Sequence, residues 1–176
     1  PFVTWEPLGG REEAGNFARF WRWLMARRQA AAEAGQSFAA YCYSAHGENH
    51  WLRSSARRFG GMRVDGATVP TLEEVDRFIG SPDWVDVFTW VRRQLLGPGG
   101  IGLKIVANEA GYTWADDGFT GEDSIYARRL ALADDGASAA ARAVREQLLR
   151  YNEDDTRATA HVRAWLRAGA PGVDRA

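Results

Sequence analysis

The last third of the chain places the strongest constraint on the fold. Residues 137–168 contain no Gly or Pro and are rich in Ala, Arg and Leu, which favours one long helix. Residues spaced by three or four lie on one face of a helix, and here they are Val144, Leu148, Tyr151, Asp155, Thr159, Val162 and Leu166. Asp155 interrupts this otherwise apolar face, one turn after Tyr151. A buried carboxylate is costly unless a basic residue, a donor network or a metal ion pairs with it, so Asp155 predicts such a partner.

The first part of the chain alternates between helix and strand patterns. Residues 12–34 and 47–58 have helical periodicity, and the uncharged aromatic run over residues 37–43 is typical of a buried strand. Residues 2–5 are also expected to form a short strand. This order of strand, helix, strand and helix predicts an α/β fold with a central sheet.

Helix-start signals organise the middle of the chain. Thr71 and Glu74 form a capping-box pattern that predicts a short helix ending at Gly80. The run Ser81-Pro82-Asp83 gives a second start signal, with a cap, a proline at the first helical position and an acid in the first turn. Asp83 is a more plausible cap than Asp86. The predicted helix continues to Leu95 and ends at residues 97–100. The other expectations are a loop or weak hairpin at 59–68, a strand or helical turn at 102–107, a loop at 110–120 and a helix at 122–132.

Composition narrows the class of protein. The chain has 176 residues, of which 45% are hydrophobic and 26% charged, which suits a single domain with a real core. Its one cysteine, Cys42, excludes a disulfide scaffold and a cysteine-based zinc site. A net charge of −1 argues against coating nucleic acid by charge alone, but not against a nucleic-acid enzyme, because bound metal ions add positive charge. Neither a membrane-spanning stretch nor a signal-peptide pattern is found, so we expect a cytoplasmic protein.

Two further acids are candidates for a site. Glu48 follows the predicted buried strand, and sites in open α/β sheets form beyond the carboxyl ends of strands. Asp86 lies among large apolar residues. Each acid also has a structural interpretation. Glu48 would stabilise a helix start, Asp86 would face solvent or pair with an arginine, and Asp155 would pair with an arginine while Tyr151 packs in the core.

The segment before the last helix carries other notable side chains. Lys104 is the single lysine among 22 basic residues. Tyr112, Trp114 and Phe119 lie in the predicted loop at 110–120. Such rings can stack on bases, but we favour core packing or anchoring of the loop.

Three segments together resemble a known family. The segment Tyr151-Asn152-Glu153-Asp154-Asp155, followed by Arg157-Ala158-Thr159, resembles the third motif of DEDD-type exonucleases of the tyrosine subgroup, which have a ribonuclease H-like fold. Residues 38–48 resemble the second motif, although the acid there is Glu48 where Asp is usual. Residues 85–88 and 102–104 resemble the stretch between these motifs in YprB-like and RecB-like nucleases. No strand resembles the first motif, Asp-x-Glu, so we expect residues 1–176 to be one partial, helix-rich domain of this fold, truncated at the N-terminus.

The resemblance implies a mechanism and partners. Such enzymes hydrolyse phosphodiesters from the 3′ end with two Mg²⁺ or Mn²⁺ ions. By position, Asp155 and Glu48 would be metal ligands, Tyr151 would orient the attacking water, Asp86 would be a further ligand or an outer acid, and Lys104 would meet a phosphate or have a structural role. The expected partners are single-stranded DNA or RNA, the upstream part of the same protein, a helicase module, and a second copy across the strand at 37–43.

Two alternatives remain beside a nuclease. A non-catalytic nucleic-acid-binding or architectural module of a helicase–nuclease would keep the fold without the reaction. An unrelated α/β domain would use Asp155 only in a structural pair with an arginine.

Overall fold

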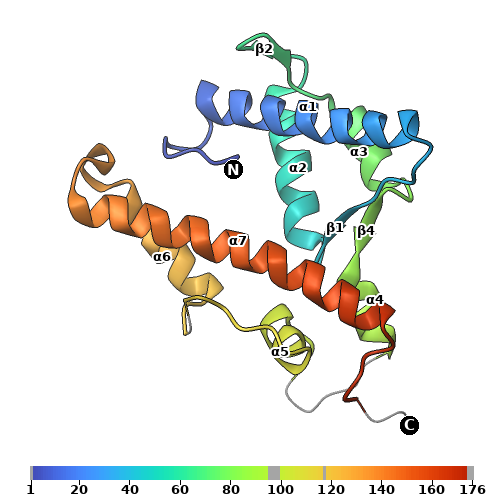
Figure 1. The fold of residues 1–176 in the computed structure, drawn as a ribbon. Coiled ribbons are helices and arrows are strands. Elements are labelled where there is room, and N and C mark those ends of the chain that lie inside the picture. Colours follow the sequence, from blue (N-terminus) through green and yellow to red (C-terminus); the bar gives the residue numbers. More distant parts are fainter. Residues whose placement is uncertain (1, 95–99, 117, 174–176) are drawn as a thin grey trace. The chain divides into compact units, whose positions relative to one another are not determined.

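The computed structural model describes residues 2–94, 100–116 and 118–173, which divide into two compact units, Pro1–Val85 and Asp86–Ala176 (Figure 1). The first unit contains α1 (Arg11–Glu33), β1 (Ala40–Cys42), α2 (His46–Phe59), β2 (Arg63–Val64), β3 (Ala67–Thr68) and α3 (Leu72–Ile79), and β4 (Trp84–Asp86) crosses the boundary. The second contains α4 (Val87–Gln94), α5 (Leu103–Glu109), α6 (Gly121–Ala131), a 3₁₀ turn (Ala133–Gly136) and α7 (Ala139–Arg167). Over the described residues, every helix is too short or too polar to cross a membrane.

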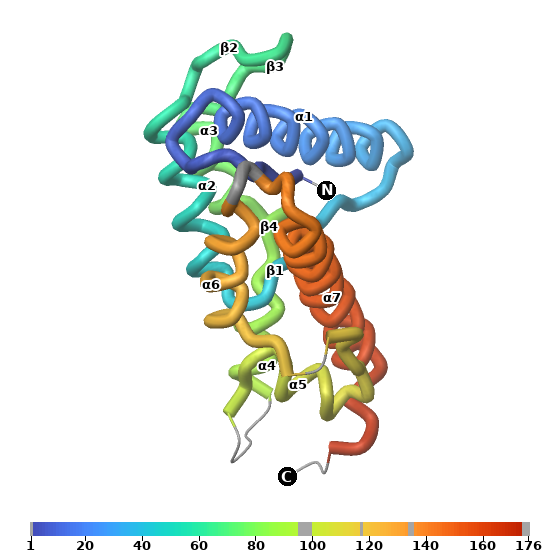
Figure 2. Tube along the Cα trace, turned by 90° about the vertical axis from the view of Figure 1, so that its left-hand side faces the viewer, coloured from blue at the N-terminus to red at the C-terminus, as the bar shows by residue number. Residues whose placement is uncertain are grey.

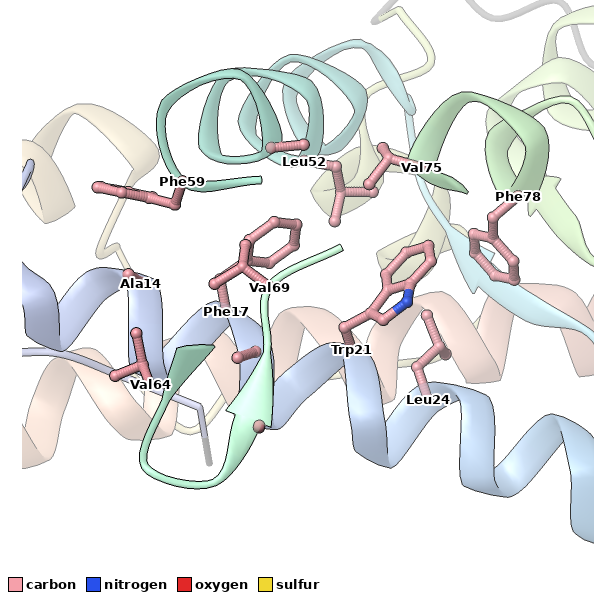
Figure 3. Packing of buried hydrophobic residues seen from close by; sticks show 13 residues of the cluster. Ala14, Phe17, Trp21, Leu24, Leu52, Phe59, Val64, Val69, Val75 and Phe78 are labelled. Carbon is pink, nitrogen blue, oxygen red and sulfur yellow. The ribbon is translucent and has the colours of Figure 1, made fainter. Parts of the chain in front are cut away.

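The core of the first unit forms where α1 meets α2, α3 and the β2–β3 hairpin (Figure 3). Phe17 of α1 is fully buried, and Trp21, one turn later, lies edge-on to Phe78 of α3 with 5.6 Å between ring centroids. Leu52 contributes from α2. Each such side chain stabilises the fold by about 1.5–3 kcal/mol when fully buried. The inner face of α1 therefore packs in this core, and the outer face of the helix is exposed to solvent.

The predicted weak hairpin is present as β2 and β3, which pair antiparallel with Arg63 opposite Thr68. It lies against α1 at Gly15, where an added Cβ would come within 3.1 Å of the Val64 side chain. A side chain larger than hydrogen would therefore push the hairpin away from the helix.

The α/β class is confirmed, with a small parallel sheet of β1 and β4. The Ala40 amide donates to the Asp83 carbonyl at 2.7 Å beside this pair. The strand predicted over residues 37–43 is thus real but short, covering Ala40–Cys42. The strand predicted at residues 2–5 is wrong. Phe2 instead packs its ring 5.6 Å from Phe20 of α1, a side-chain contact in place of backbone pairing.

The helix start predicted at Ser81-Pro82-Asp83 is wrong. These three residues form a turn, and the next three form β4 instead of a helix. The Asp83 carboxylate binds Arg28 at 2.7 Å, so it is not a cap, and Asp86 accepts from the Phe88 amide at 3.0 Å where α4 begins. The expected end of this helix at 97–100 falls almost entirely outside the described residues.

Other helix boundaries follow the sequence closely. Thr71 and Glu74 form the predicted capping box of α3, and the helix ends at Gly80. The ambiguous segment at 102–107 is helical, as α5. In the second unit, α6 packs along the first half of α7 and α5 along the second half (Figure 2). The loop between α5 and α6 therefore runs beside the middle of α7.

An acidic site on helix α7

Helix α7 forms as the sequence predicts, with Ser138 as its N-cap accepting from the Ala141 amide at 3.1 Å. Tyr151 lies on its buried face, but the buried acid is Asp154, which is 8% exposed, and Asp155 is only half-buried. The centre of the buried stripe passes through Tyr151, Asp154 and Ala158, at intervals of three and four. Helical spacing from Tyr151 fits both Asp154 and Asp155, and the packing of α7 buries Asp154.

Asp154 holds the loop that precedes α6. One carboxylate oxygen accepts from the Tyr112 hydroxyl at 2.9 Å, and the other accepts from the Ala115 amide at 2.9 Å. Both donors are neutral. Burial and the bond to Asp154 raise the pKa of Tyr112, which keeps its hydroxyl protonated as a donor at neutral pH. Asp154 is therefore an anchor for this loop.

An aromatic side chain orients Asp155. The indole Nε1 of Trp114 donates to one carboxylate oxygen at 3.1 Å, and Tyr151 lies close to the carboxylate. Burial raises the pKa of Asp155, and the bond from Trp114 and the charge of Lys104 only partly oppose it. The carboxylate is thus held in place and is costlier to ionise than a solvated aspartate.

Tyr151 is the partner that the sequence assigned to Asp155. Burial and the adjacent Asp155 charge raise the pKa of Tyr151, so its phenol is neutral at pH 7. Its ring meets Phe119 edge-on, with centroids 5.0 Å apart. The hydroxyl and the carboxylate therefore share one small volume on α7.

Lys104 joins this group from α5. Its ammonium lies 5.5 Å from the ring centroids of both Trp114 and Tyr151 and donates to the Phe119 carbonyl. Cation–π contacts of this kind contribute about 0.5–1 kcal/mol each at exposed sites. These contacts give the lone lysine a structural role, and a contact with phosphate stays a prediction.

The loop aromatics anchor the loop, as favoured from the sequence. Trp114 is 7% exposed, and Tyr112 meets it edge-on at 5.0 Å. His161 of α7 adds a bond to the Ala110 carbonyl at 2.8 Å. The bonds of Tyr112 and Trp114 to the acids could not be read from the sequence, because 41 and 42 positions separate the partners.

Glu48 and Asp86 both lie at helix starts. Glu48 is exposed in the first turn of α2, in the first unit, and Asp86 is half-buried at the start of α4. Within the described residues, neither unit brings together three or more His, Cys, Asp or Glu side chains around a position for a metal ion. Carboxylate oxygens suit Mg²⁺ and Mn²⁺. The chemistry of Asp155 therefore fits one ligand of such an ion, while the described residues do not form a complete two-ion site.

Comparison with known proteins assigns the chain to a family. The model of the RNase H superfamily matches residues 59–167, which include Asp86, Lys104, Tyr151 and Asp155. No curated protein and no solved structure matches the chain. Membership in this superfamily indicates nuclease-type activity on nucleic acid, for which RNase H-like enzymes generally use divalent metal ions. The chain belongs to the RNase H superfamily.

Proposed function

We propose that this chain is a metal-dependent nuclease domain that hydrolyses nucleic acid from the 3′ end, with Asp155 as a metal ligand and Tyr151 beside the attacking water. The observation that supports this most is the placement of the Asp155 carboxylate, which is half-buried one helical turn after Tyr151 and accepts from the Trp114 indole at 3.1 Å. Tyr151 and Asp155 lie on one helix inside the segment that matches the superfamily.

The residues of the site have separable tasks in this proposal. Trp114 fixes the orientation of the Asp155 carboxylate, and the neutral Tyr151 hydroxyl offers a donor beside it. Divalent ions, when bound, would lower the pKa of a water and stabilise the leaving oxygen. Glu48 and Asp86 are the proposed further ligands, and Lys104 the proposed phosphate contact.

The finer partners are also part of the proposal. We propose single-stranded DNA or RNA as the substrate and a helicase module as a partner. A homodimer across the edge of β1 would have only a short strand, Ala40–Cys42, to pair with. Light scattering of the purified chain that gives only the monomer mass of 19.5 kDa would contradict the dimer.

One observation favours a second candidate, a nucleic-acid-binding module without catalysis. The carboxylates of Asp154 and Asp155 accept bonds from loop donors, and Lys104 supplies a positive charge nearby. This network is satisfied by the protein's own groups, so the fold itself does not require a metal ion.

The two candidates are separated by a cleavage assay with Mn²⁺. Single-stranded DNA and RNA labelled at either end are incubated with the wild-type chain and with its variants. We expect progressive shortening from the 3′ end by the wild type, and its loss in Asp155→Asn. Glu153→Gln is the matched control, because Glu153 is an exposed acid of the same helix. Binding without cleavage by the wild type would support the second candidate, and cleavage that survives Asp155→Asn would contradict the assigned site.

A further inference from the structure

The outer face of the first unit carries large aromatic side chains in contact with solvent. Trp23 is 46% exposed, Phe2 42% and Trp51 37%. Together with the partly buried Phe20, they form a surface that we call the aromatic platform. These residues all precede residue 59, so the platform lies outside the segment that matches the superfamily.

The rings of the platform are held by one another. Phe20 lies between the exposed rings, 5.6 Å from Phe2, 6.4 Å from Trp23 and 6.1 Å from Trp51, measured between centroids. Beneath them, the fully buried Phe17 meets Trp51 edge-on at 5.3 Å. The exposed rings are therefore supported from the core and lose little further freedom when a ligand binds.

Positive charge borders this surface. Between Glu13 and Glu33, α1 contains no acid and has four arginines, at positions 19, 22, 27 and 28. Arg19 and Arg28 form ion pairs with Asp65 and Asp83. Arg22 and Arg27 are exposed and make no ion pair within the described part of the chain, and the Arg27 guanidinium lies 5.9 Å from the Trp23 ring centroid. One exposed cation, Arg27, thus lies beside the exposed Trp23 ring.

We propose that the aromatic platform binds single-stranded nucleic acid, with bases stacked on Trp23 and Trp51 and a phosphate beside Arg27. Aromatic faces accept any base, and arginines along the same surface neutralise the backbone. A duplex hides its base faces by pairing and stacking, so an open strand is the form that fits. The proposal rests on the proposed function in one respect, namely that the enzyme acts on nucleic acid.

The test is the binding of fluorescent oligo(dT) and oligo(U), measured by anisotropy in EDTA so that no strand is cleaved. Stacking on one ring is worth roughly 1–3 kcal/mol, so we expect Trp23→Leu to weaken binding about tenfold. Trp23→Phe keeps a ring and should lose less. Trp90→Leu is the matched control, because Trp90 is 39% exposed but belongs to the second unit. Arg27→Gln should reduce the dependence of binding on salt.

Two outcomes would contradict the proposal that the platform binds nucleic acid. The first is equal oligonucleotide affinity of wild type, Trp23→Leu and Trp90→Leu. The second is binding to anionic vesicles without binding to either oligonucleotide. Asp155→Asn separates this proposal from the nuclease proposal. If no protein form cleaves but the oligonucleotide affinities change as stated, the platform stands without the nuclease. If cleavage depends on Asp155 while Trp23→Leu changes neither affinity nor KM, only the platform fails.

Discussion

Each unit of the chain buries acidic side chains, but the two units pair them with different groups. In the first unit, Glu13 is 3% exposed and binds the Arg58 guanidinium through both carboxylate oxygens. The Ser55 hydroxyl and the Gly9 amide complete its partners. In the second unit, Asp154 and Asp155 accept chiefly from neutral donors, and burial raises the pKa of Asp155.

The difference shows why burial alone does not identify a functional acid. A guanidinium in bidentate contact neutralises Glu13, so that carboxylate has no charge left to offer a ligand. Asp155 is oriented by Trp114, yet the nearby Lys104 charge does not cancel the effect of burial on its pKa. The negative charge of Asp155 is therefore only partly compensated. Binding of a metal ion next to such a carboxylate would be electrostatically favourable.

The largest expected effect on stability follows from breaking the ion pair between Glu13 and Arg58. Glu13→Gln leaves Arg58 without its counter-charge, and loss of a buried pair costs about 3–5 kcal/mol. Because the Arg58 side chain is 40% exposed, water screens part of this, and we expect a loss of about 2 kcal/mol in the free energy of unfolding. Urea denaturation measures it, with the exposed neighbour Glu12→Gln as the control, expected within about 0.5 kcal/mol of wild type. Equal stability of the two variants would contradict the structural role of Glu13.

The second effect concerns the loop anchor. Asp154→Ala leaves the Tyr112 hydroxyl and the Ala115 amide without their acceptor, which costs about 1–2 kcal/mol. Hydrogen exchange of the Ala115 amide should accelerate. Glu153→Ala, at the exposed neighbouring position, should leave that amide unchanged. Unchanged exchange in Asp154→Ala would show that the loop is held by other contacts.

Capping boxes offer a matched pair across the two units. Thr71 caps α3 in the first unit and Thr120 caps α6 in the second, each accepting from the amide three residues on. Replacing either with Ala should cost about 1 kcal/mol. Thermal unfolding followed by circular dichroism measures both. A loss well above this value at one site would mean that the threonine has a second role there.

The smallest effect is the pH dependence that Asp155 contributes. Its pKa in the folded chain is raised above the ordinary 3.8, so the folded state binds the proton more tightly than the unfolded state. Stability from this group is therefore full below about pH 4 and declines as pH rises through the folded pKa. In EDTA, the free energy of unfolding of Asp155→Asn should therefore increase relative to that of wild type as the pH rises through this range. A difference between the two proteins that does not change with pH would contradict the raised pKa.

Local signals in the sequence predicted much of the fold. The capping box at Thr71, the long helix ending near residue 168 and the pairing of Tyr151 with Asp155 all depend on neighbours within a few positions. Errors arose where distant segments decide the structure. Residues 84–86 are extended because they pair with β1, more than 40 positions earlier, which overrides the helix-start signal at Ser81.

The site was predictable to the same degree. Asp155 and Tyr151 follow from helical spacing, whereas the donors Tyr112 and Trp114 reach the acids from another segment, so no local pattern could assign them. Asp154 was missed because adjacent acids at three and four positions from Tyr151 both fit a helical face. Only packing decided which one is buried.

The central claim is that Asp155 serves chemistry while Glu13 serves the fold. The most direct measurement is the rate of 3′-end shortening with Mn²⁺, per folded molecule, for wild type, Asp155→Asn and Glu13→Gln. We predict that Asp155→Asn remains folded and loses activity by at least about a hundredfold, because the proposed metal ligand is removed. Glu13→Gln should keep its rate under conditions where it stays folded. Undiminished shortening by Asp155→Asn would contradict the claim.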